Sequence, residues 1–322
     1  MGKKDIEHLG RKRLITIGTK LANNLGISAL IGSELEFYLE GGEGEEEQKK
    51  LDNQLLALVM IKCDELKILL DGVKNDSGLR QYEIVLSPNR NPVYAAENLY
   101  IVRQEIVQLA EKLGLKACFD AKPYDDQPGS GLHIHISLHD RDGHNLYSKV
   151  GDDQETAALY FSMGGLCELM AESMVFFAPT KACYARYYYK VEANDNIQQA
   201  NDNGDDSSSA SEQCQSSNAP THISWGANNR TTALRIPAST VDPDKRHIEH
   251  RVPSSQSDPF DVISAVIAGV YYGLSNRVMP PHDKLFGNAW DPQYGLEPLP
   301  HSLKEARKLS RGSKRLEDLF QD

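Results

Sequence analysis

The chain has 322 residues, of which 40% are hydrophobic and 25% are charged, and its formal net charge is −11. This is the balance of an ordinary globular protein, long enough for one large domain or two smaller ones. The acidic charge argues against nucleic acid as the main partner, because phosphate binding needs clustered Lys and Arg. The longest apolar stretch, Val262 to Leu274, is shorter than the roughly 20 residues that span a bilayer, so no membrane partner is expected.

The cysteines and the N-terminus favour a cytoplasmic protein. There are five cysteines and no CxxC pair, and an odd number suits a reducing compartment better than a disulfide framework. Residues Met1 to Arg13 are charged and lack the apolar core of a secretion signal.

The first half of the chain predicts long helices that alternate with strands. Hydrophobic periodicity and glycine positions separate these elements. In chain order we expect a helix from Asp5 to Leu25 closed by Gly26, a strand from Ala29 to Leu39, a Gly/Glu loop from Glu40 to Glu47, a helix from Leu51 to Leu70, a strand from Tyr82 to Leu86 and a helix from Val93 to Leu113 capped by Gly114.

The second half continues this pattern around one segment of different composition. Residues 192–218 are rich in Asn, Asp, Ser and Gln and contain no Lys or Arg, so they cannot bury enough apolar surface to offset their ordering entropy, and we expect a mobile insertion. The other predicted elements are a strand from Leu132 to Leu138, a buried helix from Ala157 to Phe177, strands from Ala233 to Ile236 and from His247 to Val252, and a helix from Asp258 to Val278.

The order of these elements predicts the fold class. Strands are interspersed with long helices, without the regular spacing of βαβ units and without an internal repeat. We therefore predict an α+β fold with a mainly antiparallel sheet, formed by a single domain over residues 1–322.

Four predicted strands carry polar side chains at alternate positions. Residues two apart in a strand point to the same face. Each pattern alone is more often the solvated face of a strand. Together they supply carboxylates and neutral imidazoles, which suit Mg²⁺ or Mn²⁺, and arginines, which suit phosphate. The residues are Glu34 and Glu36, Gln81 and Glu83, His133, His135 and Ser137, and His247, Glu249 and Arg251.

Five segments resemble the successive motifs of glutamine synthetases, in the same order and with similar spacing. They are GSELEF from Gly32, QYE from Gln81, GSGLHIHISL from Gly129, NRTTALRIP from Asn229 and HIEHRVP from His247. The resemblance extends from about Lys20 to Ala306 and is closest to the branch that includes γ-glutamyl-polyamine ligases. It implies a curved sheet, flanked by helices, that lines a funnel-shaped site.

The resemblance also implies an activity and a set of metal ligands. The implied enzyme uses ATP to phosphorylate the γ-carboxylate of glutamate, or of a similar acid, and condenses it with ammonia or an amine. It implies two divalent ions, Mg²⁺ or Mn²⁺. Glu36 and Glu83 match ligands of one ion, with Asp76 where the family usually has a third glutamate, and the ligands of the other match Glu34, His133 and Glu249.

Other residues match substrate contacts of the family. His135 and Ser137 match nucleotide contacts, and Gly129 matches a backbone contact to the amino-acid substrate. Arg230 and Arg235 match the arginines on the transferring phosphate, which makes them the implied catalytic residues, and Arg186 and Arg251 match those that clamp the substrate carboxylates.

Three departures from the family pattern leave alternatives open. Only about 30 residues precede Glu34, where the family carries a small N-terminal domain; residues 192–218 replace a short active-site flap; and the chain ends soon after Leu319. The resemblance implies a homo-oligomer, with a separate partner that could supply the missing domain. A non-catalytic structural or regulatory protein is the alternative. The insertion is either simply solvated or a cover that selects cationic amines, and the amine itself stays open.

Overall fold

The computed structural model describes residues 3–148, 155–187, 219–238 and 242–321. Its centre is an eight-stranded sheet with strand order β2-β3-β1-β5-β8-β7-β6, and β4 pairs with β1 beside this path. Every strand pair is antiparallel except β6 with β7. The predicted α+β class with a mainly antiparallel sheet is confirmed. The predicted insertion at 192–218 lies outside the described residues.

The bounds of the elements follow the sequence predictions closely in most places. The strands are β1 Ser28–Glu40, β2 Leu70–Asn75, β3 Gln81–Asn89, β4 Lys116–Cys118, β5 Leu132–His139, β6 Trp225–Ala227, β7 Leu234–Ile236 and β8 Ile248–His250. The helices are α1 Lys3–Leu25, α2 Glu45–Glu65, α3 Pro92–Lys112, α4 Ala157–Glu168, α5 Met170–Phe177, α6 Pro259–Asn276, α7 Leu303–Gly312 and α8 Lys314–Leu319, with short 3₁₀ turns at Ala182–Tyr187, Pro243–Lys245 and Pro292–Tyr294.

Two predicted helices have different ends in the structure. The helix predicted from Leu51 to Leu70 begins earlier, at Glu45, so the loop predicted from Glu40 to Glu47 is shorter than expected. It stops at Glu65, because Lys67 takes a left-handed φ of 58° and turns the chain into β2. That strand is short, polar and half-exposed, so it carries no clear alternation of apolar residues. The helix predicted from Ala157 to Phe177 is interrupted at Leu169 and forms α4 and α5.

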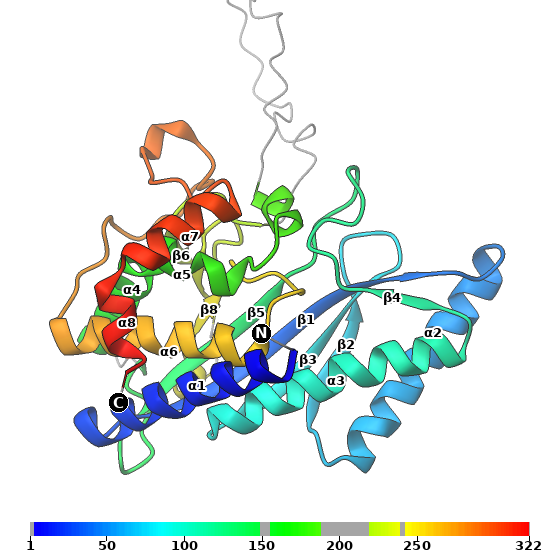
Figure 1. Ribbon diagram of the computed structural model, residues 1–322, viewed down its shortest axis with the longest axis horizontal. Coiled ribbons are helices and arrows are strands. Elements are labelled where there is room, and N and C mark those ends of the chain that lie inside the picture. Colours follow the sequence, from blue (N-terminus) through cyan, green and yellow to red (C-terminus); the bar gives the residue numbers. More distant parts are fainter. Residues whose placement is uncertain (1–2, 149–154, 188–218, 239–241, 322) are drawn as a thin grey trace, which may run out of the picture.

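One face of the sheet is covered by helices. In Figure 1, α1, α3 and α6 run together along the sheet, and α1 and α3 also contact β1. Leu35 and Phe37 of β1 and Ile134 of β5 are fully buried in the resulting core. Because side chains alternate along a strand, Glu34, Glu36 and His133 must project from the opposite face. The position of the core thus fixes which face carries the polar residues.

Helices α4 and α6 approach each other through glycines. A Cβ atom added to Gly273 would lie 2.0 Å from the carbonyl oxygen of Phe161, and one added to Gly165 would lie 2.1 Å from that of Gly269. Contacts under 3.0 Å with backbone atoms do not occur in folded proteins, so the two helices can pack this closely only with glycine at these positions.

Gly273→Ala should therefore destabilise the protein. Overpacking of this kind lowers the free energy of unfolding by about 1–3 kcal/mol, and a backbone neighbour cannot relax as a side chain can. Gly18→Ala in α1 is the matched control, because a Cβ atom there meets nothing within 4 Å. It should raise stability by about 0.5–1 kcal/mol through better helix propensity. Urea unfolding of both variants checks this, and equal effects would show that α4 and α6 do not pack as described.

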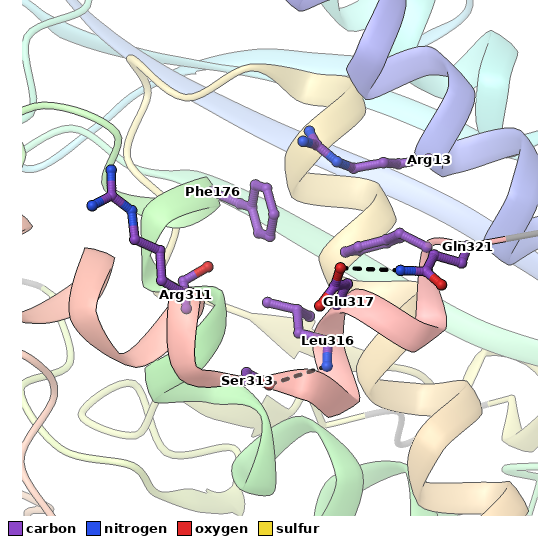
Figure 2. A pocket seen from close by; sticks show the side chains of 9 residues that line it. Arg13, Phe176, Arg311, Ser313, Leu316, Glu317 and Gln321 are labelled. Atoms are coloured by element: carbon purple, nitrogen blue, oxygen red, sulfur yellow. Dashed lines mark hydrogen bonds between the residues drawn. The ribbon is translucent and has the colours of Figure 1, made fainter.

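The C-terminal helices α7 and α8 line a separate pocket together with residues of α1 and α5. Figure 2 shows Arg13 of α1, Phe176 of α5 and Leu316 of α8 around a cavity of about 470 Å³. The Arg13 guanidinium lies 5.3 Å from the Phe176 ring centroid and donates to Asp261 of α6 at 2.7 Å. None of the residues that line this pocket belongs to the polar face of the sheet. Within the described ranges, no helix has both the length and the apolar character needed to cross a bilayer.

Candidate active site

Polar side chains from neighbouring strands form a row across the sheet face opposite α1 and α3. Directly opposed residues in an antiparallel pair share a face and have neighbouring Cβ atoms. The opposed pairs are Glu36 and Glu83, Glu34 and His133, His135 and Glu249, and Arg235 and Glu249. Strand register alone thus places residues from five separate segments of the chain side by side.

Glu34 lies at the centre of this row, between the two histidines. Its Oε2 atom is 3.2 Å from His133 Nδ1, and its Oε1 atom is 3.2 Å from His135 Nε2. Burial opposes the ionisation of Glu34, but the hydrogen bonds from His133 and His135 outweigh it and hold the pKa of Glu34 well below its usual range. Glu34 is therefore ionised at neutral pH and shared by both histidines.

Glu249 forms the second anionic centre and is almost fully buried. Its two oxygens accept from Arg235 Nη1 at 2.6 Å and from Arg251 Nη1 at 2.5 Å. Burial raises the pKa of Glu249, but the charges of Arg251, His135, His133 and Arg235 outweigh it and lower the pKa to about 2. Arg235 also donates to the Asn228 side chain at 2.6 Å, so its guanidinium is held from both ends.

The negative charges of two further carboxyl groups are less fully balanced by neighbouring positive groups. Burial and the nearby charge of Glu34 raise the pKa of Glu83, although Lys74 opposes this. Burial and the charge of Glu36 raise the pKa of Asp76. Carboxylates that repel one another in a partly buried site favour a bound cation, because its charge would remove both penalties.

The donor atoms fit divalent cations. In one group Glu34, Glu83 and His133 each offer a ligand atom, and in another Glu34, His135 and Glu249 do so, with all atoms of a group within 4.8 Å of one another. His133 Nε2 is buried and makes no hydrogen bond. A Cβ atom on Gly131 would lie 2.8 Å from this nitrogen, so the glycine leaves space beside it. Carboxylate oxygens with imidazole nitrogens are ligands of Mg²⁺ and Mn²⁺ sites.

These groups differ from the ligand sets that the resemblance implies. Glu36 lies outside both of them, although its Oε1 atom is only 3.6 Å from His133 Nε2; its Oε2 atom accepts from the Gly131 N–H at 2.6 Å. Asp76 follows β2, near enough to interact with the charge of Glu36, but it too lies outside both groups. Glu83 is grouped with Glu34 and His133 instead.

The remaining predicted residues surround this row. Ser137 is further along β5 and is 3.1 Å from His139 Nε2. Gly129 lies close to Arg186, since a Cβ atom there would meet the Arg186 side chain at 2.9 Å. The Arg186 guanidinium is buried and donates to the Val252 carbonyl at 2.7 Å, which fixes it against the segment after β8. Arg230 is exposed, and its charge interacts with that of Lys74.

Sequence reasoning missed three contributors to the site. Lys74 of β2 contacts Glu83, Asn228 holds Arg235, and the Gly131 N–H holds Glu36. Lys74 lies directly opposite Glu83 in the β2–β3 register. The sequence could have shown that Lys74 faces Glu83 only if residues 70–75 had been recognised as a strand. Asn228 has a positive φ of 48°, which nothing in its sequence context signals.

The arrangement combines anionic centres with fixed guanidinium groups. The carboxylates and imidazoles can hold divalent cations, and Arg235 and Arg251 lie within 2.6 Å of a carboxylate that borders one of them. Cations and arginines together stabilise the charge on transferring phosphoryl groups. The site is therefore suited to chemistry on a phosphorylated ligand.

Comparison with known proteins points to one family. A model of the glutamine synthetase catalytic domain matches residues 43–322. The chain is 28% identical over 305 residues to the γ-glutamylputrescine synthetase of Escherichia coli (strain K12), which covers 87% of this chain and 58% of that protein. It is 28% identical over 255 residues to a glutamate–isopropylamine ligase of a Pseudomonas species, covering 79% and 49% of the two chains.

Further relatives include glutamine synthetases. That of Pyrococcus abyssi is 28% identical over 306 residues, covering 89% of this chain and 62% of that protein. The chain thus spans about half to three-fifths of the length of these curated relatives. A solved complex of GmaS with ADP superposes with a TM-score of 0.78 at 20% identity, covering 97% of this chain and 70% of that one, which shows a shared fold.

Proposed function

Because this chain belongs to the glutamine synthetase catalytic-domain family, we propose that it is an ATP-dependent ligase that joins glutamate, or a similar acid, to ammonia or an amine. The observation that carries the proposal is the pair of ligand groups on one sheet face, with Arg235 and Arg251 fixed beside Glu249. The names of the relatives, which include ligases for putrescine and isopropylamine, support an amine as the second substrate.

The proposed chemistry follows from the poor reactivity of a carboxylate, which has no good leaving group. The γ-carboxylate oxygen forms a bond to the γ-phosphorus of ATP as the bond to the ADP oxygen breaks. The amine nitrogen then bonds to the acyl carbon, loses a proton, and phosphate leaves. Bound divalent cations would supply charge neutralisation on the phosphoryl oxygens.

The residues of this chain would bind and orient the reacting groups. We assign one cation to Glu36, Glu83 and Asp76 and the other to Glu34, His133 and Glu249, as the resemblance implies. His135 and Ser137 would contact the nucleotide, and Gly129, Arg186 and Arg251 would contact the amino-acid substrate. Arg230 and Arg235 would hold the transferring phosphate. Glu34 is a member of both ligand groups in the structure, which supports a role for it in coupling the two cations.

We further propose a single catalytic domain in a cytoplasmic homo-oligomer. A non-catalytic regulatory or structural role is the second candidate. One observation favours it: Asp76 lies outside both ligand groups while the Lys74 ammonium contacts Glu83. Glutamate-dependent release of phosphate from ATP would eliminate this candidate.

ATP binding should depend on a divalent cation. Calorimetric titration of ATP into the purified chain should show binding with Mg²⁺ or Mn²⁺ and none with EDTA. Phosphate release should then be tested with glutamate and a panel of ammonium, methylamine, isopropylamine and putrescine. Absence of ATP binding under every metal condition would contradict the proposed ligase function.

A further inference from the structure

A lysine forms an ion pair with a member of one ligand group, the group of Glu34, Glu83 and His133. Lys74 lies opposite Glu83 in the β2–β3 register, so both side chains project from the same face. Its Nζ atom is 2.6 Å from Glu83 Oε1. Glu83 is also one of the residues that offer a ligand atom together with Glu34 and His133. The lysine ammonium therefore lies against a carboxylate that could bind a divalent cation.

The two partners of this ion pair differ in exposure. The Glu83 side chain is 7% exposed, whereas that of Lys74 is 57% exposed and comes from β2 at the edge of the sheet. The carboxylate is thus fixed in the interior, and the ammonium reaches it from solvent on a flexible stem. Lys74 can move away from Glu83 into water, where its own ammonium group is solvated.

An ammonium group and a divalent cation compete for the Glu83 carboxylate. Like charges a few ångströms apart repel strongly in a partly buried site. Resting on the function proposed above, we propose that Lys74 is a resident cation of the Glu83 position, which a divalent ion must displace before it binds there. Lys74 keeps Glu83 neutralised when no metal is bound and weakens metal binding chiefly at this position.

The other ligand group does not share this arrangement. Glu249 is neutralised by Arg235 and Arg251, of which Arg251 is buried and Arg235 is anchored to Asn228. A fixed guanidinium cannot withdraw into solvent as Lys74 can. The two positions should therefore differ in metal affinity, and a change at Lys74 should affect the Glu83 position more strongly than the other.

The test measures Mn²⁺ binding directly, without turnover. Free aqueous Mn²⁺ is followed by electron paramagnetic resonance, and heats of Mn²⁺ binding by calorimetry, for the unmodified protein and three variants. Lys74→Met removes the charge and keeps the length, Lys74→Arg keeps the charge, and Lys116→Met is the matched control. Lys116 forms an ion pair of 2.9 Å with Glu40, also between two strands of the sheet but outside both ligand groups.

Lys74→Met should tighten one class of Mn²⁺ sites by about two- to fivefold, the value expected for losing a partly exposed ion pair. Lys74→Arg and Lys116→Met should bind Mn²⁺ as the unmodified protein does. Unchanged affinity in Lys74→Met, with cation-dependent ATP binding intact, would overturn the role of Lys74 and leave the proposed function standing. Absence of Mn²⁺ binding in all four proteins would overturn both.

Discussion

Glu249→Gln should reduce glutamate-dependent ADP formation by about 10²- to 10³-fold, equivalent to roughly 2.7–4 kcal/mol of transition-state stabilisation. Glutamine keeps the size of the side chain and removes its charge. The group of Glu34, His135 and Glu249 would lose one anionic ligand, and Arg235 and Arg251 would lose the carboxylate that orients both of them. Because the pKa of Glu249 is lowered to about 2, this charge is present at every pH suitable for an assay.

The control for this variant is Glu40→Gln. Glu40 is on β1 of the same sheet, opposite Lys116 of β4. It forms an ion pair with this exposed lysine and belongs to neither ligand group. Its replacement should leave the rate unchanged, since an exposed pair contributes little. Initial rates with Mg²⁺ and saturating ATP measure both variants. A Glu249→Gln enzyme with a normal rate would show that this carboxylate is not part of the phosphoryl-transfer site.

Much of the site was predictable because it is built on strand alternation. Glu34 and Glu36, and His133 and His135, are two residues apart, so the sequence alone shows that each pair shares a face. What alternation cannot show is which strands are neighbours. The pairing of β5 with both β1 and β8 brings His135 and Glu249 together across more than 100 residues of sequence. That step came from the family resemblance.

The residues that escaped prediction lie where local sequence carries no periodic signal. Strand β2 is an exposed edge strand that contains Gly72, so Lys74 could not be placed against Glu83. The backbone N–H of Gly131 holds Glu36 through tertiary contact alone. The division of the carboxylates between two ligand groups depends on such contacts, which act through space and leave no pattern along the chain.

A buried network behind the site explains why the β2–β3 hairpin has a fixed position. Asp52 of α2 is 1% exposed and accepts two hydrogen bonds from Arg80, at 2.9 Å and 2.6 Å. It accepts a third from the Tyr82 hydroxyl at 2.8 Å. Arg80 also donates to the Gly41 carbonyl at 2.6 Å and has a left-handed φ of 56°. Helix α2 is thereby joined to the hairpin that carries Glu83.

Asp52→Ala should lower the free energy of unfolding by about 3–5 kcal/mol, because it leaves a partly buried guanidinium and a buried hydroxyl without their acceptor. Tyr82→Phe removes only the third hydrogen bond and should cost about 1 kcal/mol. Urea denaturation followed by circular dichroism measures both. If the two variants were equally stable, Arg80 would not depend on Asp52, and the turn conformation of Arg80 rather than this ion pair would position the hairpin. A large difference between them would show that α2 positions the hairpin and, through it, Glu83.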